Sequence, residues 1–325
     1  MRGSLSVAVV LLGGCAWDGA RSTLVARSDF ARQILGLYGL ITWACIGIAL
    51  VVCLLLGWVL LRYRERPAAP APRQTRGHTL LELGWTVAPA LVLLVIAVPT
   101  IQVIFRTQAP LKPGALEVVV RGLQWWWEFR YPALGVVTAN ELHLPSGRPA
   151  LLRLQGADVI HSFWVPQLGG KRDVVPGRVN LIALTPDTPG EYTGQCAEFC
   201  GASHALMGLR VIVDGPEAFD RWVAAQKAPP VEAGGHAADG RAVYARSACV
   251  GCHTIRGLSA GTLGPDLTHV GSRKTLGAGL LPNTPDTLVA WLLDPGRLKP
   301  GVKMPRLPLT EGEARALATY LLSLK

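Results

Sequence analysis

The chain has 325 residues, half of them hydrophobic, with 32 lysines and arginines against 22 aspartates and glutamates. This length is enough for two or three domains. So much hydrophobic sequence is high for a soluble protein and indicates membrane segments. The seven cysteines are odd in number, and four of them fall in two short motifs, which does not fit a disulfide framework.

The first 15 residues, MRGSLSVAVVLLGGC, place one arginine before an apolar run that ends in Leu-Gly-Gly-Cys. This pattern is typical of an export signal peptide. The ending also resembles the lipobox of bacterial lipoproteins, in which the cysteine is acylated, so we expect lipidation at Cys15. An ordinary signal with an incidental cysteine is the alternative.

Two uncharged apolar runs, 38–61 and 83–105, follow within residues 16–112. Each is long enough to span a membrane as a helix, which takes about 20 residues. Residues 62–78, between the two runs, hold five arginines and a single glutamate. Short arginine-rich loops stay in the cytoplasm. The sequence therefore predicts a transmembrane hairpin with both ends outside the cytoplasm.

Residues 113–227 are predicted to form an all-β domain. Short runs rich in β-branched and aromatic residues alternate there with turn residues, which indicates a sandwich or barrel. A short helix is expected at 216–227. An Ala-, Pro- and Gly-rich linker is expected at 228–239.

Residues 240–325 have few β-branched runs and are predicted to form a small α-helical module. Helices are expected at 285–293 and 310–323. The second begins with Thr310 and Glu313, the spacing of a capping box.

Charge is distributed unevenly along the chain. The predicted β domain has 10 basic and 11 acidic residues, whereas the module at 240–325 has 11 basic and 5 acidic residues. Much of the remaining positive charge lies in the loop of the hairpin. This distribution disfavours a nucleic-acid groove. It also suggests that the module docks transiently on acidic surfaces, the β domain among them, by opposite charge.

Residues 249–253 read Cys-Val-Gly-Cys-His, the attachment motif of c-type haem. In that motif the thiols of Cys249 and Cys252 add to the porphyrin, and His253 binds the iron. A methionine completes many such sites and raises the reduction potential. We expect Met304 in this role. A zinc knuckle or a thioredoxin-like pair is the alternative, but the second cysteine pair or the βαβ pattern that these need is missing.

Residues 196–207 place two cysteines, a histidine and a methionine at the spacing C-x3-C-x3-H-x2-M. Soft thiolate and thioether ligands select copper. A second thiolate is one ligand too many for a mononuclear blue-copper site, whereas two bridging thiolates can hold two coppers with one histidine for each. We expect the second histidine to be His161. A disulfide between Cys196 and Cys200 is the alternative.

Three further histidines are not expected to be ligands. His143 alternates with apolar neighbours in ELHLP, which is typical of a strand residue. His236 and His269 are expected to be exposed.

The hairpin, QWWWEFRY, DVIHSFWVP, KRDVVPGRVN, GEYTGQCAEFCGASHALM and CVGCH together resemble subunit II of haem-copper cytochrome c oxidases with a cytochrome c domain fused at the C-terminus. The resemblance implies a multidomain protein with a two-helix transmembrane hairpin, an all-β cupredoxin barrel and an all-α class I cytochrome c domain. It implies a binuclear CuA centre in the barrel. The implied ligands are the bridging Cys196 and Cys200, His161 and His204 with one copper each, Met207, and the backbone carbonyl of Glu198.

The resemblance implies roles for several other residues. Trp125 would lie at the electron entry face over the copper centre. Glu82 would lie at the mouth of a proton channel, and the side chain of Glu198 would bind magnesium at the interface with subunit I. The GPDL stretch resembles the class I cytochrome c loop in which a proline carbonyl, here that of Pro265, orients the haem-binding histidine.

The implied function is that of subunit II of an aa3- or caa3-type cytochrome c oxidase. Electrons would pass from one covalently bound c-type haem to CuA and on to subunit I, where oxygen is reduced to water and protons are pumped. The implied partners are subunits I and III, membrane lipid, and cytochrome c or a quinol:cytochrome c reductase complex as donor. The protein would cross the bacterial cell membrane twice, with both metal domains on the extracytoplasmic side.

Two alternatives remain open. The same copper ligands occur in a CuA subunit of nitric oxide reductases. A membrane-anchored electron-transfer or copper protein without an attached enzyme is the other alternative, although a full ligand set favours a permanent centre. A quinol oxidase subunit is disfavoured, because that branch lacks the copper ligands and the haem motif.

Overall fold

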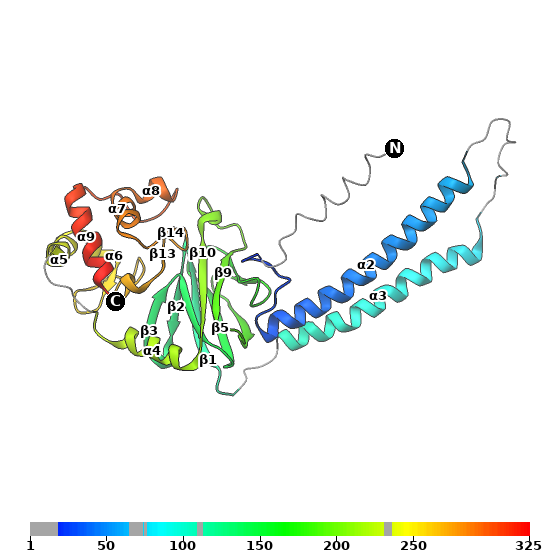
Figure 1. Ribbon diagram of the computed structural model, residues 1–325, viewed down its shortest axis with the longest axis horizontal. Coiled ribbons are helices and arrows are strands. Elements are labelled where there is room, and N and C mark those ends of the chain that lie inside the picture. Colours follow the sequence, from blue (N-terminus) through cyan, green and yellow to red (C-terminus); the bar gives the residue numbers. More distant parts are fainter. Residues whose placement is uncertain (1–18, 65–73, 75–76, 109–112, 231–235) are drawn as a thin grey trace, which may run out of the picture. The chain divides into compact units, whose positions relative to one another are not determined.

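The computed structural model describes residues 19–64, 74, 77–108, 113–230 and 236–325, and the chain divides into two compact units. One unit, residues 32–109, contains the two long helices that Figure 1 draws in blue and cyan, α2 (Asp29–Arg62, which begins three residues earlier) and α3 (Thr79–Thr107). Both are long and apolar enough to cross a membrane. Each helix is longer than the apolar run predicted from the sequence, because the helix continues into polar residues at its ends. Asp29 lies in the first turn of α2 and Arg106 in the last turn of α3, where each charge complements the helix dipole.

The β domain (residues 113–227) consists of two five-stranded sheets with the strand orders β3-β2-β1-β5-β8 and β4-β10-β9-β6-β7. Strand β1 alternates buried and partly exposed residues along its whole length, as expected when one face of a sheet covers a core. The core contains Trp127, Phe129, Leu152 and Phe163. The all-β prediction is confirmed. The strands are β1 (Leu116–Leu123), β2 (Trp126–Tyr131), β3 (Val136–Ala139), β4 (Glu141–Pro145), β5 (Ala150–Gly156), β6 (His161–Trp164), β7 (Arg172–Val174), β8 (Val179–Leu184), β9 (Gly190–Cys196) and β10 (Gly208–Asp214).

Helices surround a separate hydrophobic core in the C-terminal module (residues 236–325). The predicted helices are found as α4 (Pro216–Lys227) at the end of the β domain, and as α7 (Pro285–Leu293) and α9 (Glu311–Ser323) in the module. Thr310 and Glu313 form the expected capping box. The module also contains α5 (His236–Arg246), α6 (Cys249–Cys252) and α8 (Pro295–Leu298), and the short strands β11 (Thr254–Ile255), β12 (Ser259–Ala260), β13 (Thr275–Leu276) and β14 (Leu281–Pro282).

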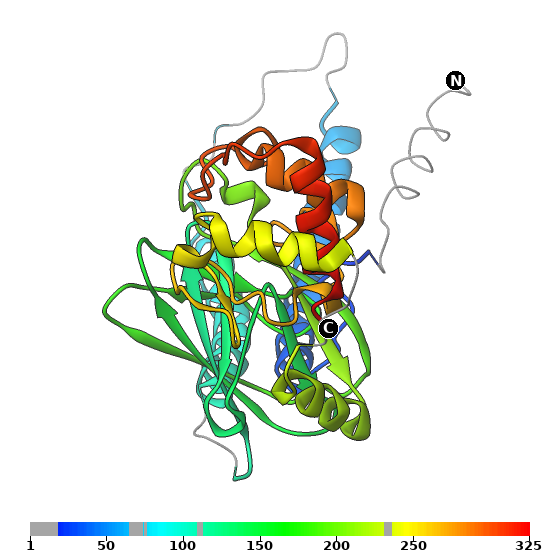
Figure 2. The ribbon, with the colours of Figure 1, turned by 90° about the vertical axis from the view of Figure 1, so that its left-hand side faces the viewer.

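Helix α5 begins inside the segment that was predicted to be linker. Its sequence, HAADGRAVYAR, is weakly amphipathic, so its apolar pattern alone did not identify a helix. Tertiary packing stabilises it, because α5 crosses α9, as Figure 2 shows with α5 in yellow and α9 in red. Gly240 lies at this crossing. A Cβ there would collide with the backbone oxygen of Ala316 and would lie 2.6 Å from the Cβ of Tyr320.

We expect Gly240→Ala to lower the free energy of unfolding of the C-terminal module by about 1–3 kcal/mol, because overpacking forces the two helices apart. Gly312→Ala, in α9, is the matched control, since nothing lies within 4 Å of a Cβ at that position. It should leave stability unchanged or raise it by up to about 1 kcal/mol through better helix propensity. Thermal unfolding followed by circular dichroism compares the two variants. Equal unfolding midpoints in Gly240→Ala and Gly312→Ala would contradict the close packing of α5 on α9 at Gly240.

Candidate metal centres

The C-x3-C-x3-H-x2-M motif forms the connection between β9 and β10. These strands pair antiparallel, with Gln195 opposite Gly208, so the connection returns to the point where it leaves the sheet. The Cys196 N–H donates to the Met207 carbonyl over 2.9 Å and ties the two ends of the motif together. Strand pairing therefore brings residues eleven positions apart into contact, as required for a ligand cluster.

His161 joins this cluster from the neighbouring strand. It is the first residue of β6, and β6 pairs with β9 so that Phe163 lies opposite Cys196. The imidazole is fully buried, and its Nδ1 lies 3.9 Å from the Cys196 Sγ. The fold therefore brings His161 next to the cysteine motif.

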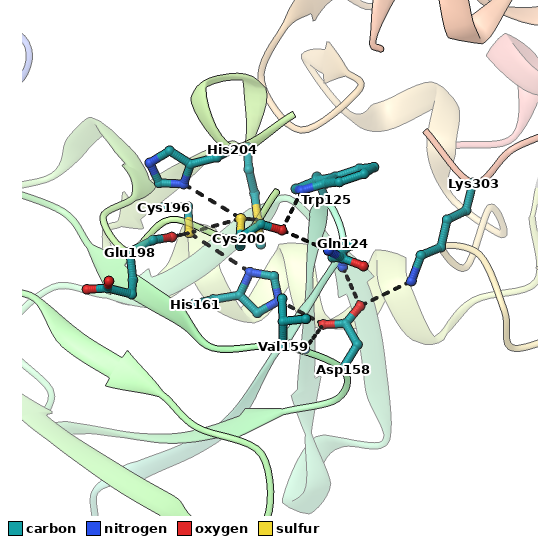
Figure 3. A network of polar contacts seen from close by, with 11 residues as sticks. Gln124, Trp125, Asp158, Val159, His161, Cys196, Glu198, Cys200, His204 and Lys303 are labelled. Atoms are coloured by element: carbon teal, nitrogen blue, oxygen red, sulfur yellow. Dashed lines mark hydrogen bonds and ion pairs between the residues drawn. The ribbon is translucent and has the colours of Figure 1, made fainter. Parts of the chain in front are cut away.

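Five distances define the cluster shown in Figure 3. The Sγ atoms of Cys196 and Cys200 are 3.8 Å apart, and both cysteines are free thiols. The Cys200 Sγ lies 3.6 Å from the His204 Nδ1 and 3.8 Å from the Met207 Sδ. The Cys196 Sγ lies 3.3 Å from the Glu198 carbonyl oxygen and, as stated, 3.9 Å from His161.

This donor set fits a pair of soft metal ions. Ligands bound to one ion at about 2.0–2.3 Å in a tetrahedral arrangement are about 3.5 Å apart, similar to the distances found here. Each sulfur has one imidazole nitrogen beside it, and the two sulfurs face each other. Both cysteines are 4% exposed and Met207 is fully buried, so water has little access. The arrangement is symmetric in the way that two bridged ions would need.

Ionisation of the two thiols is coupled. Burial opposes a charge on Cys196, but hydrogen bonds from His161 and from the backbone outweigh it and lower the pKa of this thiol. Burial and the charge on Cys196 both raise the pKa of Cys200. Burial also opposes a charge on His161, but Cys196 and Asp158 outweigh it and raise the pKa of the imidazole. The metal-free cluster thus favours a charge on Cys196 over a charge on Cys200, and binding of metal releases the thiol protons.

Asp158 orients His161 and was not identified from the sequence. Its carboxylate accepts a 2.8 Å hydrogen bond from the His161 Nε2, and backbone N–H groups of Gln124 and Val159 also donate to it, over 2.7 and 2.8 Å. Burial opposes the charge of this carboxylate, but these hydrogen bonds outweigh it and lower the pKa of Asp158. The bond fixes the proton on Nε2 and leaves Nδ1 to face Cys196. The only signal in the sequence is an acid three residues before the histidine.

Trp125 lies over the cysteine loop. Its Nε1 donates to the Cys200 carbonyl over 3.0 Å, and the side-chain amide of Gln124 donates to the same oxygen over 2.8 Å. Trp127, in contrast, is fully buried in the barrel core, with its ring edge-on to Phe163. Trp125 therefore lies against the Cys200 side of the cluster, whereas the Trp127 ring packs edge-on to His161 from the barrel core, with 6.0 Å between the ring centroids.

The Cys-Val-Gly-Cys-His motif begins with the single turn of α6, which holds both cysteines and ends at His253. The His253 Nδ1 lies 2.8 Å from the Pro265 carbonyl oxygen. A carbonyl oxygen only accepts hydrogen bonds, so Nδ1 carries the proton. The lone pair of Nε2 is then free to bind a metal. Burial lowers the pKa of His253, which favours the neutral imidazole that a metal needs. Gly264 lies against the ring, where a Cβ would be 2.5 Å from Cε1.

Apolar side chains suited to a haem surround this motif. Cys249 belongs to the buried cluster of the module, and Leu258, Leu267 and Met304 pack against that cluster. A proximal imidazole with its tautomer fixed, two thiols one turn apart and a partly buried methionine make a donor set that fits a c-type haem.

Several other residues were singled out from the sequence. Cys15 falls outside the described residues. Glu82 lies exposed in the first turn of α3, and the side chain of Glu198 is 45% exposed, 3.9 Å from Lys171. His143 is a strand residue, as predicted, and its Nδ1 lies 2.8 Å from Asp214.

One expectation about histidines is wrong. His269 is 5% exposed rather than exposed, because its Nε2 contacts the Gln226 carbonyl oxygen over 3.1 Å where the module packs on α4. The side chain of His236 lies outside the described residues.

Three family models match the chain. The model described as the transmembrane domain of cytochrome c oxidase subunit II matches residues 23–103, and that of the periplasmic domain matches residues 134–214. A cytochrome c model matches residues 237–325. These domains imply copper in the β domain and haem in the module. Together with the two apolar helices they make the protein membrane-anchored.

Individual relatives agree with the family models. Cytochrome c oxidase subunit 2 of Alkalihalophilus pseudofirmus is 37% identical over 333 residues, covering 99% of this chain and 96% of the relative. The protein of the same name from Bacillus sp. strain PS3 is 36% identical over 286 residues, covering 81% of this chain and 80% of the relative. Among solved structures, the periplasmic domain of subunit II of the Bradyrhizobium japonicum cytochrome oxidase is 30% identical and covers 36% of this chain and 97% of its own length, with a TM-score of 0.35.

The first of these relatives aligns with this chain along nearly the whole length of both proteins. The chain therefore belongs to the cytochrome c oxidase subunit 2 family, as an electron-transfer subunit of a haem-copper oxidase with a cytochrome c domain at its C-terminus.

Proposed function

We propose that this protein is the electron-input subunit of a proton-pumping oxidase of the aa3 or caa3 type, carrying a covalently bound c-type haem and a binuclear copper centre. The proposal rests on one observation: two free, buried thiols lie 3.8 Å apart, each beside its own imidazole, in the same folded unit as the haem motif. When bound, the haem and the copper pair supply reversible one-electron transfer.

In this proposal Cys196 and Cys200 bridge the two coppers, and His161 and His204 bind one copper each. Met207 and the carbonyl of Glu198 are weaker ligands. The Met207 Sδ lies close to the Cys200 Sγ, and the Glu198 carbonyl oxygen lies close to the Cys196 Sγ. These contacts support counting both groups among the ligands. The buried, preorganised ligands would rearrange little between oxidation states, which suits rapid electron transfer.

In the module, Cys249 and Cys252 form the covalent bonds to the haem, and His253 and Met304 bind its iron. The Pro265 carbonyl accepts a hydrogen bond from the His253 Nδ1 and so orients the ring. Nε2, on the other side of the ring, is left to bind the iron. Gly264 leaves room for the ring, since a side chain there would overlap it.

Further parts of the proposal concern the membrane and the partner subunits. The chain crosses the bacterial cell membrane twice through α2 and α3, with both metal domains on the extracytoplasmic side, and Cys15 is acylated after signal cleavage. Subunits I and III are its partners, with cytochrome c or a quinol:cytochrome c reductase complex as donor. Glu82 lies at the mouth of a proton channel, Glu198 binds magnesium at the subunit I interface, and Trp125 is the electron entry residue.

Purification of the complex from native membranes tests the catalytic part. Co-purification of a-type haem and consumption of oxygen with a reduced one-electron donor are expected. Turnover of nitric oxide without consumption of oxygen would instead assign the chain to a nitric oxide reductase. Isolation of the chain with both cofactors but without a large subunit would make it a free-standing electron carrier.

We expect Cys200→Ser to abolish the mixed-valence electron paramagnetic resonance signal of the copper pair, because a hydroxyl does not replace a bridging thiolate. The c-type haem absorption should be unchanged, since Cys200 lies in the other domain. Met304→Ala is the reciprocal control: it should alter the haem spectrum and leave the copper signal intact. A two-copper signal that survives in Cys200→Ser contradicts the proposed ligand set.

Asp158→Ala should lower the apparent copper affinity about 10- to 100-fold, the usual effect of losing the carboxylate that orients a metal-bound histidine. Asp158→Asn should have a smaller effect, because the amide oxygen still accepts from the His161 Nε2. Competition with a copper chelator measures both affinities. Asp220→Ala, on the exposed face of α4, and Lys303→Gln, which removes the lysine 3.3 Å from Asp158, should both bind copper as the unchanged protein does. Unaltered affinity in Asp158→Ala would rule out the orienting role.

A further inference from the structure

The side chain of Lys299 is buried where the C-terminal module packs on the β domain. It follows α8, is 2% exposed, and its Nζ donates three hydrogen bonds to backbone carbonyls. Two of the acceptors belong to the β domain, Trp125 at 2.7 Å and Leu206 at 2.9 Å. The third, Gly277 at 2.7 Å, belongs to the module. One ammonium group thus joins three segments of two domains.

Buried lysines are costly unless they are paired. No carboxylate pairs with Lys299 among the residues that the structure describes. Burial lowers the pKa of Lys299 to about 7, yet three carbonyl acceptors require all three protons of the ammonium form. Three backbone carbonyls therefore stabilise the ammonium group, with a further favourable charge interaction from Cys200. Two of the three carbonyls are within reach only when the two domains are in contact.

The two β-domain acceptors are part of the copper-site loops. Trp125 is the tryptophan that donates to Cys200, and Leu206 lies between His204 and Met207 in the ligand motif. Replacing this lysine therefore removes a contact to both segments without altering any predicted metal ligand.

The residues after Lys299 continue the contact. The Ser203 hydroxyl donates to the Pro300 carbonyl. At Gly301 a Cβ would lie 3.1 Å from the Trp125 ring and 3.2 Å from the Cβ of Ala202. Gly301 also has a φ of +76°, which suits glycine at this close approach.

The same stretch then reaches the predicted haem ligand. The Lys303 ammonium lies 3.3 Å from the Asp158 carboxylate, as Figure 3 shows, and Met304 is the next residue. The segment 299–304 therefore runs from the copper-site loops to the methionine of the haem site, with Trp125 beneath it.

The edge of this interface is charged and solvent-accessible. Lys274 forms an ion pair with Glu191, and both the Lys274 and the Lys303 side chains are more than half exposed. Exposed pairs of this kind contribute little and are screened by salt. The basic module and the acidic β domain thus form ion pairs at the edge of their interface, and the centre of the interface is formed by buried hydrogen bonds.

We propose that Lys299 is a positioning residue that fixes the C-terminal module on the copper-site loops in a single electron-transfer arrangement. This inference rests on the proposed function. The step that it serves moves one electron from the reduced haem to the oxidised copper pair, with no bond formed or broken. The electron is resupplied by the one-electron donor of the oxidase. Transfer then proceeds from a fixed contact and not from the transient, salt-sensitive docking that charge alone suggests.

Lys299→Met in the full chain, loaded with copper and haem, tests the proposal. Methionine matches the unbranched lysine side chain as far as the ε position and lacks only the terminal ammonium with its three donors, so two β-domain carbonyls lose their partner. We expect haem-to-copper transfer after rapid reduction of the haem to slow about tenfold or more. The copper and haem spectra should stay unchanged. Hydrogen exchange of peptides covering residues 199–207 and 299–304 should become faster.

Salt provides a readout that a general loss of structure would not produce. Between low and high ionic strength, the unmodified protein should change its transfer rate less than about twofold, because its central contacts are buried. Lys299→Met should slow further, since only exposed pairs then hold the module. Lys274→Met is the matched control: it removes one exposed pair and should keep the hydrogen-exchange protection of segment 299–304.

Transfer rates and exchange in Lys299→Met that equal those of the unmodified protein would overturn the proposal. If Lys299→Met fails to bind either cofactor, Lys299→Gln decides by the same two measurements. It retains two donors and should give an intermediate rate. Absence of copper or haem from the unmodified chain would instead overturn the proposed function. Normal cofactor spectra with equal rates would remove only the role of Lys299.

Discussion

The structure of the metal cluster depends on the antiparallel pairing of β9 with β10. Because the strands run back along each other, the loop between them must begin and end at the same place, and the Cys196 N–H closes it on the Met207 carbonyl. Two thiols are thereby held 3.8 Å apart in a site that excludes water. They cannot both ionise easily there, as the opposite pKa shifts of Cys196 and Cys200 indicate. Strand pairing therefore holds the two thiols close together, and their ionised forms become fully stable only when cations are bound between them.

The same loop also receives the C-terminal module. Its outer side carries Trp125, and the module covers this side with Gly301 and with the buried Lys299. Glu141 strengthens the contact further away, where its buried carboxylate accepts from the backbone N–H groups of Lys274 and Thr275 over 2.8 and 3.0 Å. Directional, desolvated hydrogen bonds thus define the relation of the two domains, and the salt-screened pairs at the edge add little to it.

Sequence patterns identified the parts of the protein whose signals are local. The helices α4, α7 and α9 were predicted closely because capping and apolar periodicity lie within each segment. Both metal motifs were recognisable because their spacings concern neighbouring residues. Helix α5 was not predicted, and its first residues were assigned to the linker, since its stability comes from packing against α9. The burial of His269 was missed because α4, which covers it, is more than forty residues away in the chain.

The sequence alone thus identified the candidate ligands: two thiols, an imidazole and a thioether in one loop, a second histidine further back in the chain, and a haem-attachment motif in a separate module. Tertiary structure decided how they are oriented and connected. Asp158 becomes the partner of His161, and Lys299 the partner of Trp125 and Leu206, only through contacts between distant segments. The physical reason is that a buried carboxylate or ammonium must form hydrogen bonds with whichever donors and acceptors the fold places beside it. Those partners come from distant segments, so the spacing of residues along the chain does not identify them.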